Sequence, residues 1–375
     1  MKYRVAIFIS MSLMLTAVVW NTSSNRGTMM PMAVAATRRV SNGQIIQING
    51  DVQLKRSLGR IIRPTIGTQV YPGDELLTAR GAQVLVQCAD LKMWSVKAGE
   101  NRLNSCLEAT EEAECTPGTY KCPHRGDDIA WNNASIPYII SPRRTALLND
   151  KPTLRWNPVA GETSYTVSIE GEGVNWTTQV SSPQVIYSGE PPLKPGSSYL
   201  LMVKANSTRV SSLDEPVRPG GLNFSLLGEN QAQLVRAAKE QIEQQEWTDQ
   251  AKALALAHLY TKNDLISEAI TTLEELVQSG VQTAPIYRTL GDLYLNYLAL
   301  VPQARDYYSK AVELASSDNL EERTAAQDGL GQVQKALGNK DEAVRWLTQA
   351  RDGYKSSGDS ERASALEKQL KELVH

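Results

Sequence analysis

Few residues in this chain could form a nucleophilic or metal-binding site. Its 375 residues include three histidines and four cysteines. A Ser–His–Asp or Cys–His arrangement would have to use His124, His258 or the terminal His375. No Gly-x-Ser-x-Gly turn, phosphate-binding loop, dinucleotide fingerprint or aspartate-rich calcium loop accompanies them. The sequence therefore predicts a protein that is not an enzyme and that uses no cofactor and no metal ion.

The four cysteines form one cluster. Cys88, Cys106, Cys115 and Cys122 lie within 35 residues, and the rest of the chain has none. An even, clustered number in an exported chain indicates disulfides. Of the three possible pairings we expect the two that are closest in sequence, Cys88–Cys106 and Cys115–Cys122. Zinc, with His124 as an extra ligand, is the alternative, although the short Cys-x2-Cys pair typical of zinc sites is missing.

The N-terminus has the layout of an export signal. Lys2 and Arg4 precede a mostly apolar run over residues 5–20. This run is shorter than the roughly 20 residues that a membrane-spanning helix needs. Residues 33–35 supply a small-x-small cleavage site, so we assign residues 1–35 to a signal peptide, with an uncleaved N-terminal anchor as the alternative. In both cases we expect the protein to be exported and to be periplasmic or associated with the cell envelope.

Charge and proline are distributed unevenly along the chain. The net charge of −2 gives no indication of nucleic-acid binding or of attraction to an anionic membrane. From Glu229 to the end the chain has 16 Lys/Arg and 23 Asp/Glu and only two of its 17 prolines. Twelve prolines lie between Pro117 and Pro219. Because proline disrupts helix interiors, the last third can form long helices and the middle cannot.

Residues 43–103 alternate polar and apolar side chains between turn signals, which predicts a small antiparallel β-domain. Asn49-Gly50 predicts a two-residue hairpin, and Ala98-Gly99 a second strand pair. Gly67, Gly73-Asp74, Thr78 and the alternating segment 82–88 resemble a FecR-like β-domain, which we place at residues 40–105. That family includes membrane regulators that signal to a sigma factor from a cytoplasmic segment. Only four residues precede the apolar run here, so the resemblance implies an extracytoplasmic module.

A second β-rich block follows a cysteine-rich linker at residues 106–134. Seven short apolar segments between Pro, Gly and Ser clusters predict a β-sandwich over residues 135–228. Trp156 is expected in its core. The segment 193–205, with Tyr199 at a corner, resembles a late strand of a fibronectin type III or immunoglobulin-like module. Such modules serve as spacers or binding platforms, and the fold alone does not fix a function.

The last third, residues 229–375, contains an internal repeat. Small residues recur at a spacing near 34 residues, the length of a tetratricopeptide repeat (TPR). The small residues that mark the repeat are Ala257, Gly291 and Gly331 in the first helices and Ala269, Ala304 and Ala343 in the second. The three units resemble TPR helix pairs, followed by a polar capping helix. The uneven intervals predict one extra residue near 298–302 and a longer loop around 316–322.

In a TPR stack the conspicuous tyrosines are packing residues. We assign Tyr294 and Tyr308 to the seam between paired helices, Gly291 to close helix approach and Pro302 to the start of a helix. The exposed side of each first helix forms the concave binding face. Its residues are His258, Lys262, Arg288, Asp292, Leu295, Asn296, Asp328, Gln332 and Lys335. Its mixed charge favours a polar segment of a protein or peptide.

The predicted architecture is therefore multidomain, with two all-β domains followed by an all-α helical-repeat solenoid. The favoured function is a non-enzymatic exported scaffold or adaptor that binds a protein or peptide partner through its repeats. Two alternatives remain. One is a cell-envelope sensor or regulator that acts through the FecR-like domain. The other is a cell-wall glycan binder that uses aromatic residues such as Trp94 or Trp176.

Overall fold

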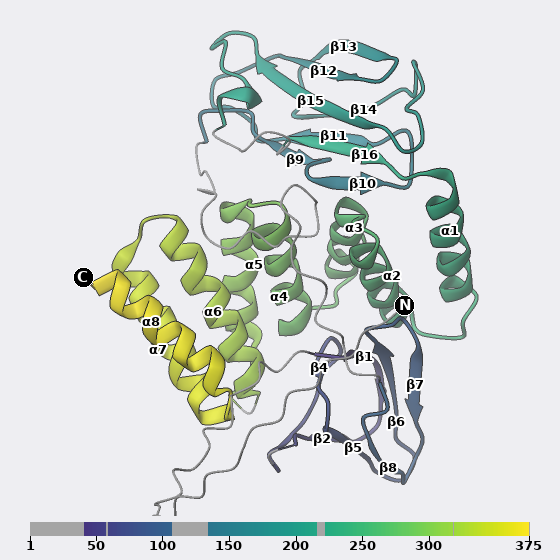
Figure 1. Cartoon of the computed structure of the whole chain (residues 1–375), viewed down its shortest axis with the longest axis vertical. Helices are drawn as coiled ribbons and strands as arrows, with labels where there is room; N and C mark the ends of the chain where they lie inside the picture. Colours follow the sequence, from purple (N-terminus) through teal and green to yellow (C-terminus); the bar gives the residue numbers. More distant parts are fainter. Residues whose placement is uncertain (1–40, 58, 107–133, 216–221, 318, 375) are drawn as a thin grey trace, which may run out of the picture. The chain divides into compact units, whose positions relative to one another are not determined.

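The structure of the chain is a computed structural model, and it describes residues 41–57, 59–106, 134–215, 222–317 and 319–374. In these ranges a β-rich region precedes eight α-helices (Figure 1). This confirms the predicted order of β-rich and helical regions. None of the described helices is both long enough and apolar enough to cross a membrane. The predicted signal segment, residues 1–35, lies outside the described residues.

The first β-domain consists of two four-stranded sheets with the orders β4-β1-β6-β7 and β3-β2-β5-β8. All of its strand pairs are antiparallel. Its strands are β1 (Gly43–Asn49), β2 (Val52–Lys55), β3 (Ile61–Ile62), β4 (Gln69–Val70), β5 (Glu75–Thr78), β6 (Gln83–Cys88), β7 (Met93–Val96) and β8 (Asn101–Leu103). The side chains between the sheets form one buried cluster that includes Ile45, Leu54, Leu76 and Val84.

The two predicted hairpins of this domain are wrong. The chain changes sheets at Asn49-Gly50, because β1 pairs with β6 whereas β2 pairs with β5. It changes sheets again between β7 and β8. A glycine turn with positive φ, such as Gly50 at +80°, can connect facing sheets as readily as neighbouring strands. The deciding factor is burial, since β1 buries side chains on both of its faces.

One predicted disulfide is present. Cys88 at the end of β6 is bonded to Cys106, which follows β8, with a Cα–Cα distance of 5.3 Å. Both residues belong to the buried cluster between the sheets. Cys115, Cys122 and His124 lie outside the described residues, so the second pairing stays a prediction.

The second β-region also has two sheets, with the orders β10-β16-β15-β12-β13 and β14-β11-β9 (Figure 1). Its strands are β9 (Ile139–Ser141), β10 (Thr145–Leu147), β11 (Thr153–Trp156), β12 (Tyr165–Gly171), β13 (Val174–Val180), β14 (Gln184–Ile186), β15 (Ser198–Ala205) and β16 (Asn223–Leu226). The seven predicted strands are all observed. Trp156 is 1% exposed in the core between the sheets. The eighth strand, β10, was not predicted, because all three of its residues are buried and no alternation marks it.

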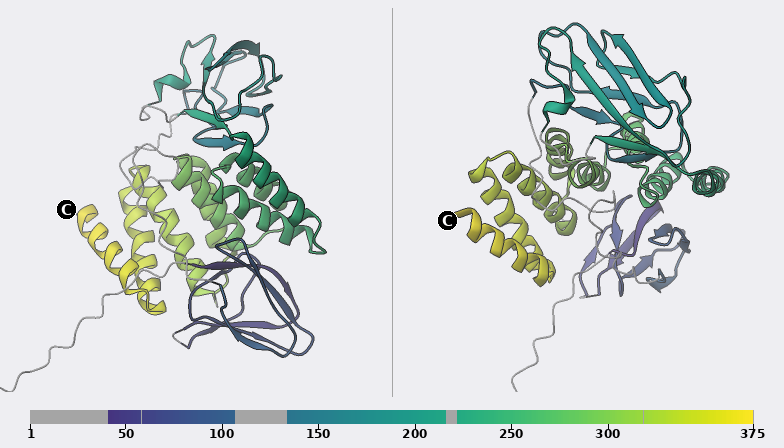
Figure 2. Two further views of the ribbon diagram at one scale, coloured as in Figure 1. Left: turned by 45° about the vertical axis from the view of Figure 1, so that its right-hand side comes forward. Right: turned by 45° about the horizontal axis from the view of Figure 1, so that its top comes forward.

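The helical region contains three helix pairs flanked by one helix at each end (Figure 2). Its helices are α1 (Glu229–Glu243), α2 (Asp249–Lys262), α3 (Ile266–Gln278), α4 (Ala284–Asp292), α5 (Val301–Leu314), α6 (Leu320–Ala336), α7 (Lys340–Ser357) and α8 (Ser360–Val374). A Cβ at Gly291 would lie 2.8 Å from the Tyr308 ring, and one at Gly331 would lie 2.5 Å from Leu347 Cδ2. These contacts confirm that small residues allow the paired helices to approach closely.

The irregular repeat spacing lies inside helices rather than in loops. The extra residue of the second unit forms a π turn at Leu293–Tyr297, in which the Leu298 amide donates to the Leu293 carbonyl. The predicted longer loop before the third unit is wrong. Five residues separate α5 from α6, and five also separate α3 from α4. Instead α6 has 17 residues where α2 has 14, so the repeat is lengthened by about one helical turn.

Both β-regions are packed against the helices. Ile46 and Leu85 of the first domain and Tyr138 of the second belong to the same buried cluster as the residues of α2 to α5. Thr145 Oγ1 of β10 accepts hydrogen bonds from the amides of Ile266 and Ser267 at the start of α3. This hydroxyl replaces the missing side-chain cap of α3, whose own N-cap residue is Leu265.

Candidate protein-binding face

Arg288 of α4 lies at the centre of a partly buried ionic network. Its Nε donates to Glu322 Oε1 at 2.6 Å, and its Nη1 contacts the Asp292 carboxylate. Asp292 also accepts a hydrogen bond from the Tyr308 hydroxyl at 2.7 Å. Burial opposes ionisation of Arg288, but Glu322 and Asp292 outweigh it, and the pKa of Arg288 lies above its usual value. Arg288 was predicted as an exposed binding residue, whereas its side chain is 11% exposed and holds neighbouring helices together.

A second network joins α6 to the helices that follow. The Tyr354 hydroxyl donates to Asp328 Oδ2 at 3.1 Å, and the Arg362 guanidinium lies over the Tyr354 ring at 5.4 Å. Gln332 and Gln369 exchange hydrogen bonds of 3.0 and 2.7 Å between their side-chain amides. Asp328 and Gln332 therefore connect α6 to α7 and α8. They were predicted only as residues of the binding face, and this packing role was not predicted.

The other predicted face residues are more accessible. Lys262 ends α2 and Lys335 lies in the last turn of α6, and both are exposed. His258 in α2 and Asn296 in the π turn are partly exposed. Leu295, also in the π turn, packs against the large buried cluster. Apart from Leu295, these positions present polar groups of mixed character on the first helices of the three pairs.

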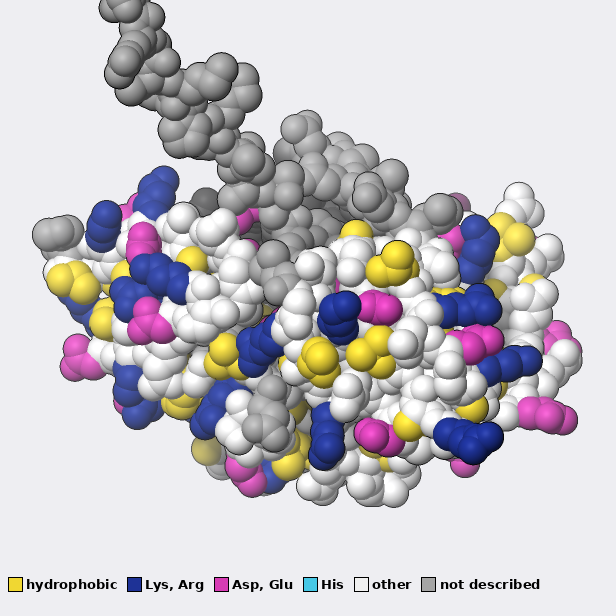
Figure 3. Space-filling model, turned by 90° about the horizontal axis from the view of Figure 1, so that it is seen from below, with side chains coloured by type: hydrophobic (Ala, Val, Ile, Leu, Met, Phe, Trp, Pro, Cys, Tyr) yellow, Lys and Arg dark blue, Asp and Glu magenta, His cyan; other side chains and the backbone are white. Residues whose placement is uncertain are grey.

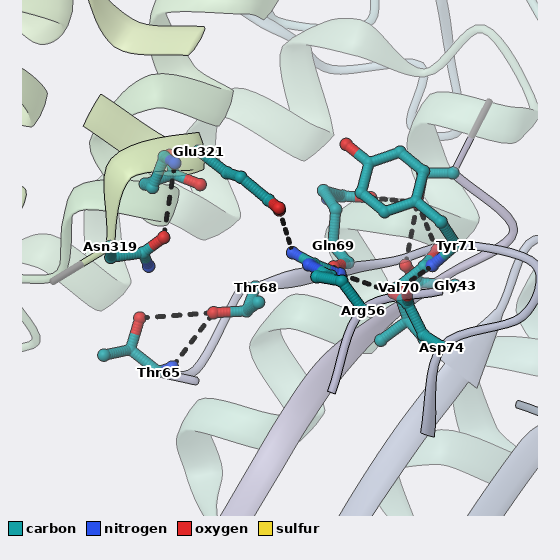
Figure 4. A network of polar contacts seen from close by, with 12 residues as sticks. Gly43, Arg56, Thr65, Thr68, Gln69, Val70, Tyr71, Asp74, Asn319 and Glu321 are labelled. Atoms are coloured by element: carbon teal, nitrogen blue, oxygen red, sulfur yellow. Dashed lines mark hydrogen bonds and ion pairs between the residues drawn. The ribbon is translucent and has the colours of Figure 1, made fainter. Parts of the chain in front are cut away.

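The first β-domain reaches the same face. Arg56, which follows β2, pairs with Asp74 at 2.5 Å inside its own domain and donates to the Gln69 carbonyl at 3.0 Å (Figure 4). Its other terminal nitrogen pairs at 2.5 Å with Glu321 in the first turn of α6. Arg56 is only 3% exposed and Glu321 17%. Burial opposes the charge of Arg56, but Glu321 and Asp74 raise its pKa above the usual value.

Tyr71 accompanies Arg56 on this face. The Arg56 guanidinium lies 5.2 Å from the centre of the Tyr71 ring, within the range of a cation–π contact (Figure 4). Tyr71 and Arg56 therefore form one cation–aromatic pair at the end of the first β-domain that reaches Glu321.

Three further contacts extend this interface along the helices. Gly67, at φ +91°, lies against Pro285 of α4, where a Cβ would be 2.7 Å from the proline Cβ. The Thr283 hydroxyl donates to the Ile66 carbonyl at 3.4 Å. Gln87 Nε2 of β6 donates to the Ala255 carbonyl of α2 at 3.2 Å, and both groups are buried. The first β-domain thus packs on this face against α2, α4 and the start of α6.

Sequence reasoning missed Glu321, Glu322, Tyr354 and Arg362. The sequence gives no indication of the role of Glu322, because an acidic residue at the start of a helix is usually solvated and stabilises the helix dipole. Tyr354 and Arg362 were missed because they lie in α7 and α8, outside the first helices to which the face was assigned. One sequence feature could have indicated these residues. The interval before the third repeat is longer than the others, and the additional residues extend the first helix of that repeat, α6.

Metal-ligand clusters, surface charge and two tryptophans bear on the other candidate sites. The described residues contain no group of three or more His, Cys, Asp and Glu side chains that could hold a metal ion. Figure 3 shows one face of the molecule, on which basic and acidic side chains are interspersed rather than separated by sign. Trp94, proposed as a glycan-contacting aromatic, is buried at 8% exposure, and the Trp176 ring packs edge-on against Tyr187.

Comparisons with known proteins identify part of the helical region. Residues 282–356 match the family model described as tetratricopeptide repeat, and they contain α4 to α6 and all but the last residue of α7. This match confirms the prediction of TPR repeats for these residues. The helix pair α2 and α3 precedes the matched segment and has the same small-residue packing, with Ala257 and Ala269 buried. No curated protein matches the chain.

Solved structures similar to the chain include MamA, with 20% identity over 37% of this chain and 85% of that one and a TM-score of 0.27. A structure of PcrH in complex with the chaperone binding region of PopD has 17% identity over 35% and 96%, with a TM-score of 0.30. YrrB, described as a TPR protein with an unusual peptide-binding site, has 18% identity over 38% and 78%, with a TM-score of 0.27. Because these scores are low, the identification of the repeats rests on the family match and the helix geometry.

Proposed function

We propose that this chain is a non-enzymatic exported scaffold that binds a protein or peptide partner through its TPR face. The observation that carries this proposal is the family match over residues 282–356, together with the helix pairs that it covers. Stacked helix pairs create an extended concave surface, and repeat proteins of this kind use such surfaces for binding. The accessible polar residues His258, Lys262, Asn296 and Lys335 lie on its first helices.

The two β-regions then act as modules that set reach or attach the repeats to an envelope component. We assign residues 40–105 to a FecR-like domain and residues 135–228 to an immunoglobulin or fibronectin type III-like sandwich. Support for the first comes from its turn residues, since Asp74 is fully buried and accepts the Tyr71 amide at 2.9 Å. Support for the second comes from its two facing sheets and from the Tyr199 hydroxyl, which accepts the Lys194 amide at 2.6 Å.

An extracytoplasmic location fits one structural feature. The Cys88–Cys106 disulfide is expected to persist in an oxidising compartment and to be reduced in the cytosol. Together with the signal-like residues 1–35, it supports export to the periplasm or cell envelope. Mass analysis of the mature N-terminus tests cleavage, and a chain that begins at Met1 would instead support an uncleaved anchor.

The sensor alternative is favoured by one observation, the ion pair between Arg56 of the FecR-like domain and Glu321 of the repeats. Such a contact could carry a signal from one module to the other. This alternative also requires an uncleaved anchor, so the same N-terminal analysis separates the two functions.

Partner capture tests the scaffold function directly. The full mature protein is used as bait against an envelope fraction, beside a variant that carries Asn296→Ala and Lys335→Glu on the face. A matched control carries Lys371→Glu on the exposed side of α8. We expect the face variant to lose a partner that the wild type and the control retain. Identical partner sets for all three baits would argue against binding at this face.

A further inference from the structure

The face assigned to partner binding is already occupied by the chain itself. Arg56 pairs with Glu321 of α6, Gly67 lies against Pro285 of α4, and the Tyr71 ring lies beside the Arg56 guanidinium. These three residues come from turns or short connections of the first β-domain rather than from its core strands. They contact the repeats as a bound peptide segment would, with one arginine and one aromatic ring.

The ion pair at this end of the domain can be broken without leaving the buried Arg56 unpaired. When Arg56 leaves Glu321, it keeps Asp74 and the Gln69 carbonyl, both of which belong to its own domain. Glu321 loses this cation, but it lies in the first turn of α6, where opening exposes it to water and the N-terminal end of the helix favours its negative charge. An unpaired buried charge is costly, so an arginine that keeps a carboxylate of its own domain lowers the free-energy cost of opening.

The other end of the domain is held more firmly. Ile46 and Leu85 belong to the buried cluster of the helices, and Gln87 donates to the Ala255 carbonyl in a buried hydrogen bond. Apolar burial and a buried hydrogen bond oppose separation there. The domain is therefore expected to stay attached at α2 while the Arg56 and Tyr71 end opens.

We propose that Arg56 and Tyr71 form an internal ligand that occupies the TPR face, and that the partner displaces them with an arginine and a neighbouring aromatic of its own. This inference rests on the proposed function, because it names the chemistry that the same face recognises. Glu321 receives the arginine of the partner. Its aromatic ring takes the place of the Tyr71 ring beside that arginine. Only open molecules can bind the partner. The apparent affinity of the protein for the partner is therefore the affinity of the open state multiplied by the fraction of molecules that are open.

The closed state is tested without any partner. Amide hydrogen exchange is measured on the full mature protein, on Tyr71→Ala and on Glu321→Gln. We expect faster exchange in the β4–β5 turn and in the first turn of α6 for both variants, with unchanged exchange in α2. Glu361→Gln, an acid in the first turn of α8, is the matched control and should leave both segments unchanged. Unchanged exchange in both test variants would overturn the internal ligand, whatever the outcome of partner capture.

The recognition chemistry is tested with a synthetic peptide, Arg-Tyr-Pro-Gly-Asp, which joins an arginine to the chain's own turn sequence. We expect Tyr71→Ala to bind this peptide about tenfold more tightly than the wild type, because its face is open in a larger fraction of molecules. Adding Glu321→Arg to Tyr71→Ala should remove that gain, since it repels the arginine of the peptide. Equal affinity of the wild type and Tyr71→Ala, or binding that survives Glu321→Arg, would overturn the proposal. A failed capture experiment would contradict only the proposed function.

Discussion

Arg143 caps the carbonyl oxygen of Leu298, to which its Nε donates at 2.8 Å. Leu298 directly follows the π turn, where a helix end leaves carbonyl groups without intrahelical partners. The same guanidinium forms a two-bond ion pair with Glu215, at 2.8 and 2.7 Å. A buried arginine of the β-sandwich region thus stabilises the irregular helix end of the second repeat.

Replacing Arg143 alone is expected to destabilise the protein strongly. Arg143→Met leaves the nearly buried Glu215 carboxylate without its partner, a change that costs about 3–5 kcal/mol. Urea unfolding followed by tryptophan fluorescence measures this loss. The double variant Arg143→Met with Glu215→Leu should lose less than the single variant, because no unpaired charge remains. A double variant as unstable as the single one would show that the cap on Leu298, rather than the ion pair, dominates.

Glu268 should make stability depend on pH. Burial raises its pKa to about 7, although the Leu148 amide donates a hydrogen bond to it at 2.8 Å. The folded state therefore holds the proton to higher pH than the unfolded state, in which the pKa of this carboxyl is near its ordinary value of 4.5. As pH rises from about 4.5 through 7, deprotonation of this group removes stability, by about 3 kcal/mol in all.

Glu268→Gln tests this assignment, since glutamine keeps the acceptor for the Leu148 amide and never ionises. We expect the variant to be more stable than the wild type at pH 8 and nearly equal to it at pH 4.5. Thermal unfolding over this pH range measures the difference. Glu275→Gln on the same helix is the control, and it should follow the wild-type profile. A wild-type profile for Glu268→Gln as well would contradict the buried, protonated side chain.

Periodicity predicted the elements of this chain better than their pairing. The spacing of Ala257, Gly291 and Gly331 identified the helix pairs, because close helix approach needs a small residue at a fixed position in each repeat. Asn49-Gly50 identified a turn but not its partner strands, because a local turn does not determine which sheet the next strand joins. Register and pairing depend on burial of both faces of β1, which involves helices about 200 residues away in sequence.

The candidate face was predicted only in part for a related reason. Helical spacing places Arg288 on the outer side of its helix, but it does not show what covers that side. The carboxylate of Glu322 comes from the next repeat, 34 residues away, so its approach depends on tertiary packing. The π turn was likewise visible only as one extra residue, whose position within the helix depends on the Leu293–Leu298 hydrogen bond.

Gly291 should not tolerate a larger side chain. A Cβ there would lie 2.8 Å from the Tyr308 ring, which is 1% exposed and fixed by its hydrogen bond to Asp292. Overpacking of this kind costs about 1–3 kcal/mol, which outweighs the gain of up to about 1 kcal/mol that alanine brings to a helix. We therefore expect Gly291→Ala to lower the free energy of unfolding in urea. Gly228→Ala, where nothing lies within 4 Å of the new Cβ, is the control for steric overlap, and it should lose only the preference of the α1 N-cap for glycine over alanine.

Removing the Cys88–Cys106 disulfide should destabilise the first β-domain. The two residues are 18 positions apart, and the chain-entropy model gives about 3 kcal/mol for a loop of about this length. Cys88→Ala with Cys106→Ala should therefore unfold at lower urea concentration than the oxidised wild type. Adding a reductant should destabilise the wild type by more than this variant, because the variant has already lost the bond. Peptide mapping of the oxidised protein should recover the Cys88–Cys106 link. Four reactive thiols in protein isolated from its native compartment would contradict the disulfide and would remove one support for export.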